Sequence, residues 1–351
     1  MNYSRVFIDA IGYELPPVVV TSTELESRLT GLYDTLRIPK GQLEALTGIT
    51  ERRWWDEGYS LSEGATAAGK HALGMANVRP SDIDVLIYAG VCREQFEPAT
   101  ACRVAAGIGV SSDAAVYDLS NACLGVLNGM IDVANRIELG QIRAGLVVSC
   151  ETAREINDIM IDKMLRDRSM ELFKTSLATL TGGSGAVAML LTDGSFGSDR
   201  RRLVGGVTQN AAQFHSLCRW GLEVIKPLGL GLDTFGQYMS TDSVAVLKNG
   251  VELGVRTWSA FLRKLGWLSD HVDKVICHQV GTGHRDTILQ MLGLEAAKTF
   301  STFSHLGNIG TVSLPLTAAL AEERGFLNPG DRVGLLGIGS GLNCLMLGVE
   351  W

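Results

Sequence analysis

Short apolar runs alternate along the chain with longer segments in which apolar residues recur every three or four positions. The first pattern is typical of buried strands, and the second is typical of helices that cover a sheet. The helical spacing is clearest in the segment that carries Leu124, Leu127, Ile131, Ala134 and Ile137. Strands are expected at Val6–Ile11, Asp84–Ala89, Ala114–Leu119, Ala144–Ser149, Ala186–Leu191, Leu203–Thr208, Lys274–Cys277, Arg332–Gly337 and Cys344–Glu350. The alternation predicts an α/β protein with helices layered on a sheet.

Two pairs of segments resemble each other at nearly the same separation. Asp84–Ile87 resembles Lys274–Cys277 at 190 positions, and Gly140–Val148 resembles Pro329–Gly337 at 189 positions. Strands of α/β proteins also resemble one another by chance, but two matches at nearly one separation favour an internal duplication. The sequence therefore predicts two halves of similar fold.

We expect the first half to comprise residues 1–195 and the second half to comprise residues 196–351. The join falls at the turn-rich segment Gly194–Ser198. Residues 151–182 interrupt the alternation of strand and helix patterns in the first half with helical segments that are rich in charge and methionine. An insertion of this kind is either a cap over a site or a surface excursion that meets no ligand, and the sequence leaves both interpretations open.

The composition narrows the class of protein. The 351 residues are 46% hydrophobic and 20% charged, as in globular domains, and the formal net charge of −7 argues against a nucleic-acid binder. No apolar run is long enough to span a membrane, and the N-terminus lacks the pattern of a signal peptide, so a cytoplasmic location is expected. None of the seven cysteines forms a CxxC pair, so free thiols are expected and a metal site is not.

Cys123 lies in the segment Asp118–Gly125, between a predicted strand and an amphipathic helix. The positive end of a helix stabilises a thiolate, so this position is expected to lower the pKa of the thiol. The small residues Ala122 and Gly125 leave room for a substrate carbonyl. Taken alone, the motif also fits a cysteine that is simply buried in the core.

Two further polar residues occur at strand or helix ends. His278 follows the predicted strand Lys274–Cys277, where α/β proteins place their sites, and it is a candidate general base or hydrogen-bond donor. Asn308 is flanked by Gly307 and Gly310 ahead of an apolar helix, and its amide is a candidate donor to a developing oxyanion. A structural histidine and an ordinary turn are the alternatives.

Together, Cys123, His278 and Asn308 at these junctions resemble the thiolase superfamily of condensing enzymes, close to β-ketoacyl-ACP synthase III. Further segments that resemble this family are Leu46–Trp54, Thr181–Ala186 and Leu336–Asn343. The resemblance implies a thiolase fold, in which two duplicated αβα halves form a five-layer αβαβα sandwich. It implies an acyl-Cys123 intermediate and an oxyanion hole formed by the backbone N–H groups of Cys123, Gly339 and Ser340.

Glu97 separates two branches of this family. In synthase III the residue before the matching proline, here Pro98, is typically apolar, and a glutamate there is similar to the OleA-type enzymes of bacterial olefin biosynthesis. The resemblance implies a homodimer in which Glu97 reaches the neighbour's site. It also implies a Claisen condensation of two fatty acyl-CoA molecules without decarboxylation, giving a 2-alkyl-3-keto acid. Removing a proton from an unactivated α-carbon needs a base, and a carboxylate in a dry pocket is a strengthened one.

Two other functions stay open at this level. One is a decarboxylative β-ketoacyl-ACP synthase III that uses malonyl-ACP and needs no such base. The other is a non-catalytic thiolase-fold partner subunit, although such subunits usually lose the nucleophile and this chain keeps Cys123.

The resemblance implies no cofactor beyond the coenzyme A of the substrate, with acyl-ACP as an alternative donor. Synthase III enzymes commonly hold the nucleotide with a tryptophan and an arginine, but the matching positions here are Gln42 and Leu46. CoA must then be held by other residues. The candidates are Arg200, Arg201, Arg202 and Arg219.

Overall fold

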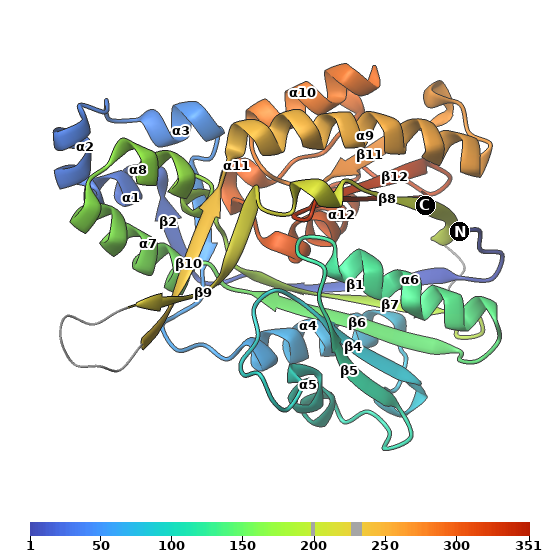
Figure 1. The fold of residues 1–351 in the computed structure, drawn as a ribbon. Helices are drawn as coiled ribbons and strands as arrows, with labels where there is room; N and C mark the ends of the chain where they lie inside the picture. The colour runs from blue at the N-terminus through green and yellow to red at the C-terminus, as the bar shows by residue number, and fades with distance from the viewer. Residues whose placement is uncertain (198–200, 226–233) are drawn as a thin grey trace.

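The computed structural model describes residues 1–197, 201–225 and 234–351, and its centre is a nine-stranded sheet (Figure 1). The strand order is β11-β12-β13-β8-β1-β7-β6-β4-β5. These strands are β1 (Phe7–Glu14), β4 (Val85–Ala89), β5 (Ala115–Leu119), β6 (Ala144–Glu151), β7 (Gly185–Thr192), β8 (Arg202–Asn210), β11 (Lys274–Cys277), β12 (Arg332–Gly339) and β13 (Asn343–Glu350). They coincide with the nine strands predicted from the sequence, apart from small differences at their ends.

The two parts of the sheet have the same connectivity. In the first part β1 is antiparallel to β7, β7 is antiparallel to β6, and β6 is parallel to β4. In the second part β8, β13, β12 and β11 repeat these three relationships in the same order. The strands that carry the repeated sequence segments therefore occupy equivalent places. The parts meet where β1 pairs with β8 through Phe7 and Arg202.

Both halves share a hydrogen bond between an aspartate carboxylate and a backbone N–H. The Asp84 carboxylate accepts the N–H of Arg143 at 2.8 Å, and the Asp273 carboxylate accepts the N–H of Arg332 at the same distance. Each aspartate precedes a strand with a parallel neighbour, β4 or β11, and ties it to the start of that neighbour. Equivalent side chains thus fix the register of both halves.

Six helices complete the layers. Helices α4 (Leu61–Ala76) and α5 (Thr100–Ile108) pack on the outer face of the first part of the sheet, and α9 (Ser243–Leu265) and α10 (Thr282–Leu292) pack on the outer face of the second part. Helices α6 (Gly125–Glu138) and α12 (Ser313–Glu323) lie between the two parts, in one shared apolar core. The arrangement is the expected five-layer αβαβα sandwich (Figure 1).

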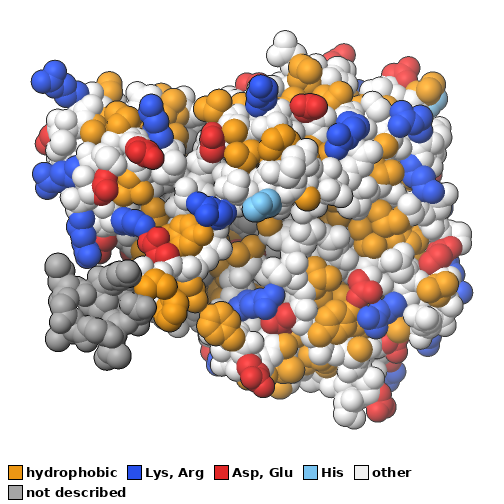
Figure 2. All heavy atoms as spheres, in the orientation of Figure 1, with side chains coloured by type: hydrophobic (Ala, Val, Ile, Leu, Met, Phe, Trp, Pro, Cys, Tyr) orange, Lys and Arg blue, Asp and Glu red, His pale blue; other side chains and the backbone are white. Residues whose placement is uncertain are grey.

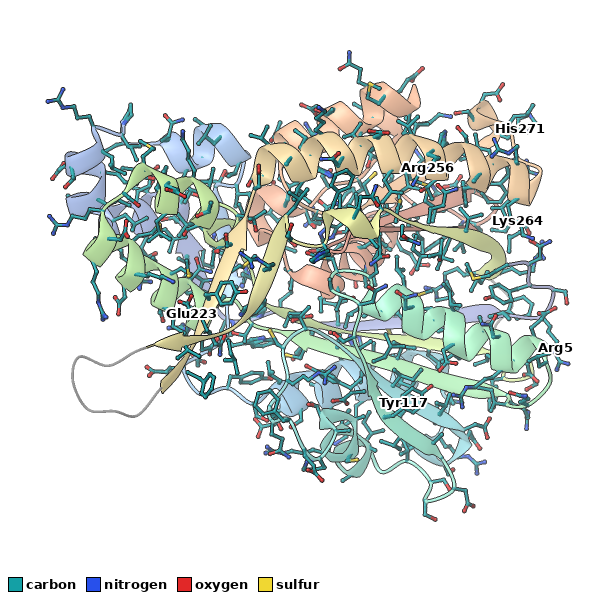
Figure 3. All side chains as sticks on the ribbon, in the orientation of Figure 1. Arg5, Tyr117, Glu223, Arg256, Lys264 and His271 are labelled. Carbon is teal, nitrogen blue, oxygen red and sulfur yellow. The ribbon has the colours of Figure 1, made fainter. Side chains whose placement is uncertain are left out.

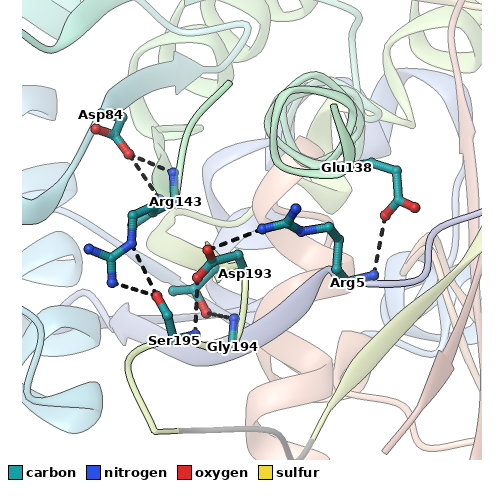
Figure 4. A network of polar contacts seen from close by, with 9 residues as sticks. Arg5, Asp84, Glu138, Arg143, Asp193, Gly194 and Ser195 are labelled. Atoms are coloured by element: carbon teal, nitrogen blue, oxygen red, sulfur yellow. Dashed lines mark hydrogen bonds and ion pairs between the residues drawn. The ribbon is translucent and has the colours of Figure 1, made fainter. Parts of the chain in front are cut away.

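The segment after β7 is held by a polar network (Figure 4). Asp193 pairs with Arg5 at 3.4 Å, and the Ser195 hydroxyl accepts a hydrogen bond from the Arg143 guanidinium at 2.6 Å. The segment at the predicted join is therefore held to the first half through Asp193 and Ser195. The division of the chain at residue 195 stays a prediction, and Ser198 lies outside the described residues.

The insertion at residues 151–182 packs as part of a separate helical cluster, here called the cap. It forms α7 (Arg154–Asp167) and α8 (Met170–Ser176), which share a buried apolar cluster with the helices α1 (Ser22–Arg28), α2 (Thr30–Leu36) and α3 (Gln42–Thr47). The insertion is thus not a loose surface excursion. Met160 and Met164 are buried, whereas Met170 is partly exposed.

Two small two-stranded sheets that the sequence patterns did not reveal frame the cap. Strands β2 (Val18–Thr21) and β3 (Glu51–Trp54) pair beneath it, and strands β9 (Cys218–Ile225) and β10 (Thr234–Thr241) pair beside it. Glu223 on β9 forms an ion pair with Lys163 of α7 at 2.5 Å (Figure 3). None of the described helices is both long enough and apolar enough to cross a lipid bilayer.

Close packing of α4 on β1 generates a stability prediction. A Cβ at Gly12 would lie 2.3 Å from the backbone oxygen of Ala68 and 2.5 Å from the backbone nitrogen of Ala72, and neither atom moves without shifting the helix. We expect Gly12→Ala to lower the free energy of unfolding by about 1–3 kcal/mol, measured by urea denaturation.

Gly74→Ala is the matched control for this prediction, because a Cβ at Gly74 on the same helix meets no atom within 4 Å. It should leave stability unchanged or raise it by up to about 1 kcal/mol, since alanine favours a helix over glycine. Equal effects of the two substitutions would contradict the packing argument.

Candidate active site

A cavity of about 750 Å³ lies where the two halves and the cap meet. Cys123, His278 and Asn308 all line it, together with Gly339 and Ser340. The structure therefore brings together the residues that the sequence analysis selected from distant parts of the chain. Further lining residues are apolar: Ile156 and Leu177 of the cap, and Val246, Leu247, Ile338 and Leu342 of the second half.

Cys123 is presented by a tight turn ahead of α6. Ala122 has a left-handed φ of 46°, a conformation that a residue with a side chain adopts at a cost of about 1 kcal/mol or more. The first turn of α6 is also bonded across the molecule, because the N–H of Val126 donates to the Thr311 hydroxyl at 2.7 Å. Thr311 precedes α12, so the starts of the two central helices are fastened together next to Cys123.

The prediction that the helix end lowers the pKa of the Cys123 thiol was wrong. Burial, with smaller contributions from nearby Cys218 and Glu151, raises the pKa of its thiol to about 12, and a hydrogen bond from its own backbone N–H acts to lower it. The helix end was expected to stabilise the thiolate, but burial disfavours the charged form of the thiol. The resting thiol is therefore protonated at neutral pH, and its attack on a substrate requires a proton acceptor.

His278 follows β11 and supplies an uncharged imidazole. Its backbone N–H donates to the Leu336 oxygen of β12 at 3.0 Å, which holds the residue at the strand end. Burial, with a smaller contribution from the neighbouring His284, lowers the pKa of His278 to about 3. At neutral pH the ring has one lone pair and one N–H, so it accepts or donates a proton according to its tautomer.

Asn308 is fixed by three hydrogen bonds. Its N–H donates to the Thr181 oxygen and its carbonyl accepts the Gly183 N–H, both at 2.9 Å. Its side-chain oxygen accepts the Gly310 N–H at 3.0 Å. The side-chain NH₂ is left as the donor available to a ligand, as an oxyanion-stabilising amide requires.

The end of β12 lies against the backbone of Cys123. A Cβ at Gly339 would lie 3.4 Å from the Cys123 backbone nitrogen and 3.2 Å from Cγ of Leu124. The closeness of these two backbone segments fits the predicted oxyanion hole, whose donors remain a prediction.

Glu97 does not line the cavity of its own chain. It is exposed in the loop between β4 and α5, next to Phe96, whose side chain is 91% exposed. The carboxylate that does line the cavity is Glu151, which accepts the backbone N–H groups of Val91 and Cys92 at 2.9 and 3.0 Å. Burial raises the pKa of Glu151 despite these hydrogen bonds. Sequence reasoning missed it, although an acid that ends a fully apolar strand was a visible signal.

The arginines proposed to hold CoA fall into three groups. Arg219 lines the cavity and its guanidinium lies 5.8 Å from the centre of the Tyr238 ring. Arg201 contacts Glu322 at 3.1 Å and Arg202 contacts Glu350 at 2.6 Å, and neither lines the cavity, so the structure does not support CoA contacts by these two. Arg200 lies outside the described residues.

Charges near the cavity do not form a single-sign surface. On the face drawn in Figure 2, Lys and Arg side chains are interspersed with Asp and Glu side chains and with hydrophobic patches. Leu46 lines the cavity in place of the arginine that synthase III enzymes commonly have there. Among the described residues, no cluster of three His, Cys, Asp or Glu side chains is arranged to hold a metal ion.

Comparisons with known proteins agree with this geometry. Residues 262–351 match the family model described as 3-oxoacyl-[acyl-carrier-protein] synthase III C terminal. Over the full length of both chains, the protein is 56% identical to the acyl-CoA:acyl-CoA alkyltransferase of Shewanella oneidensis and 36% identical to that of Xanthomonas campestris. A crystal structure of Xanthomonas OleA, 36% identical, superimposes with a TM-score of 0.92 and covers all of both chains.

The fold and the site define a condensing enzyme of the thiolase superfamily. Within it, the chain belongs to the acyl-CoA:acyl-CoA alkyltransferase family, the OleA enzymes. This membership favours condensation of acyl-CoA over the malonyl-ACP reaction and over a non-catalytic subunit. Solved structures of the Xanthomonas relative include one with bound lauric acid and lauroyl-CoA, one with cerulenin, and variants at a cysteine, a histidine and a glutamate.

The raised pKa of Cys123 predicts how the thiol reacts with alkylating agents. Only the thiolate reacts, so the rate of iodoacetamide labelling at Cys123 should rise about tenfold per pH unit across the neutral and mildly alkaline range. Peptide mass spectrometry measures the rate at this residue, and Cys123→Ala identifies the signal of the other cysteines. A plateau near neutral pH would show that the helix end outweighs burial.

The lowered pKa values of two histidines predict acid destabilisation. Burial lowers the pKa of His284 to about 4, and that of His278 to about 3. Below pH 6.5 the unfolded chain binds protons at these rings before the folded chain does, so stability falls as pH falls. His284→Phe should reduce that loss by about 2 kcal/mol between about pH 6.5 and 4.5, measured by urea denaturation.

His271→Phe is the control for the acid experiment, because His271 is exposed and meets water in the folded and the unfolded chain. It should leave the pH dependence of stability as it is in the wild type. If His284→Phe also leaves it unchanged, the ring of His284 is not held uncharged by the fold.

Proposed function

We propose that this protein joins two fatty acyl-CoA molecules by a Claisen condensation without decarboxylation and releases a 2-alkyl-3-keto acid. The observation that carries the proposal is the single cavity lined by Cys123, His278 and Asn308, with apolar walls suited to acyl chains. Support comes from full-length relatives named for acyl-CoA:acyl-CoA alkyl transfer and from the Xanthomonas structure with lauroyl-CoA. Free cysteines throughout the described chain fit a cytoplasmic location.

In the first half-reaction Cys123 becomes acylated. The thiol proton passes to the uncharged imidazole of His278 as the sulfur attacks the thioester carbon. The carbonyl oxygen then carries negative charge, which the N–H groups of Cys123, Gly339 and Ser340 stabilise. The intermediate collapses by breaking the bond to the CoA sulfur, which takes up a proton and leaves.

In the second half-reaction a carbanion attacks the acyl group. Glu97 from a second copy of the chain removes an α-proton from the second acyl-CoA, and the enolate oxygen accepts hydrogen bonds from the Asn308 amide and from His278. The enolate carbon attacks the acyl-Cys123 carbonyl, and the Cys123 sulfur leaves and is protonated again. Hydrolysis of the remaining thioester with one water gives the keto acid and CoA.

The dimeric role of Glu97 rests on its place in the single chain. Its side chain is exposed and lies outside the cavity beside a nearly fully exposed Phe96, a combination typical of residues that another subunit covers. A homodimer brings this loop of one copy to the cavity of the other. Arg219 is the described arginine in place to contact the CoA phosphates, and no cofactor beyond CoA is required.

Mass spectrometry with a single substrate tests this reaction. Wild-type protein incubated with palmitoyl-CoA alone should carry an acyl adduct on Cys123 and form the keto product without malonyl-ACP. Glu97→Ala should keep the adduct and lose product by about 100-fold or more, because a general base is worth that much. Glu57→Ala, at another exposed glutamate, is the control and should behave as wild type.

Mixing two inactive variants tests the exchange of Glu97 between chains. In a heterodimer of Cys123→Ala with Glu97→Ala, one of the two cavities has both residues. After subunit exchange, activity should recover in about a quarter of the cavities for random pairing. No recovery, with heterodimers shown to form, would place Glu97 in its own chain's reaction or outside the reaction altogether.

A further inference from the structure

A second histidine, His284, stands beside the catalytic one. It lies in the first turn of α10, lines the reaction cavity with His278, and is half-buried. The Nδ1 atoms of both rings are buried and have no hydrogen-bond partner in the protein. A buried polar atom left without a partner is destabilising, so each of these two atoms calls for a hydrogen-bond partner.

A small second cavity offers the place for that occupant. Its volume is about 20 Å³, and both imidazoles line it. That volume holds one water molecule, which needs about 10–15 Å³ and at least two polar partners. The rest of the lining consists of the apolar or weakly polar residues Gly250, Gly254, Cys277, Ile288, Leu336, Gly337, Ile338, Cys344 and Met346.

Two glycines of α9 keep this space open. Gly250 and Gly254 are one turn apart in a helix of 23 residues, where glycine is less favourable than alanine. A Cβ would lie 2.9 Å from Cδ1 of Ile338 at the first position, and 3.0 Å from Cδ1 of Ile288 at the second. Larger residues would press on the walls of the small cavity.

The proposed reaction makes opposite demands on His278. To accept the thiol proton, Nε2 must be bare and the ring proton must be on Nδ1. To donate to the enolate oxygen, Nε2 must carry the proton and Nδ1 must be bare. Because burial keeps both rings uncharged at rest, a single tautomer of His278 serves only one half-reaction.

We propose that one water bound between the two Nδ1 atoms links His284 to His278 and switches the tautomer of His278 between the half-reactions. This inference rests on the proposed condensation. In the free enzyme Nδ1–H of His278 donates to the water, the water donates to Nδ1 of His284, and His284 carries its proton on Nε2. His284 acts through His278 and is a positioning residue.

Protons are conserved in both half-reactions. During acylation His278 gains the Cys123 proton on Nε2 and passes its Nδ1 proton through the water to Nδ1 of His284. His284 then releases its Nε2 proton into the cavity, where the departing CoA sulfur takes it. During condensation the Cys123 sulfur regains the Nε2 proton of His278, the Nδ1 protons move back through the water, and the proton taken by Glu97 restores Nε2 of His284.

Nitrogen NMR of ¹⁵N-histidine-labelled protein reads the tautomers directly. The free enzyme should show His278 with its proton on Nδ1 and His284 with its proton on Nε2. The acylated Glu97→Ala variant, which accumulates the acyl-enzyme, should show both assignments reversed. An unchanged His278 tautomer on acylation would overturn the proposal, as would a high-resolution crystal structure with no water between the two Nδ1 atoms.

Kinetics of His284→Gln separate a relay from a structural role. Glutamine keeps a donor and an acceptor for the water but does not pass a proton, so acylation of Cys123 should fall less than about tenfold and condensation by about 100-fold or more. His284→Phe removes the bridge, and both steps should slow. Wild-type condensation by His284→Gln would refute the relay, whereas absence of adduct and product in the wild type would refute the condensation itself.

Discussion

The cavity in which the two halves and the cap meet partly shields Cys123 from water and buries His278 and Glu151. Burial acts on acids and bases in opposite directions: it raises the pKa of the thiol and of the carboxyl group and lowers that of the imidazole. All three groups are pushed toward their uncharged forms. Charge therefore develops only as bonds to a substrate form, where fixed amide donors stabilise it most strongly.

The architecture holds the walls of this cavity through contacts away from Cys123. The cap helices share their own apolar cluster, so their packing does not rely on a ligand. The bond from Val126 to Thr311 ties α6 to the start of α12, and Cys123 and Asn308, which precede these helices, line the same cavity. Glu151 anchors the backbone at Val91 and Cys92, near the root of the loop that carries Glu97.

The fold was predictable because its strands are buried on both faces and read as continuous apolar runs. Strands β9 and β10 were missed because a hairpin with one exposed side, as at Phe235, resembles an ordinary loop. Cys123, His278 and Asn308 were found from motifs at strand and helix ends. The direction of the thiol pKa shift was not predicted, because it depends first on how deeply the fold buries the sulfur and then on groups from distant segments, such as Cys218. Arg201 and Arg202 were selected as CoA-binding candidates for their charge, and the sequence did not reveal that each pairs with a glutamate of the same chain.

The approaches to the two central helices carry different chemistry. Cys123 lies ahead of α6 and Asn308 lies ahead of α12, the two helices that the repeat relates, so one half contributes a thiol to the cavity and the other contributes a carboxamide. Two identical halves would bring the same residue to the cavity from both sides. A single polypeptide allows its halves to differ there, which a symmetric pair of identical chains is unable to do.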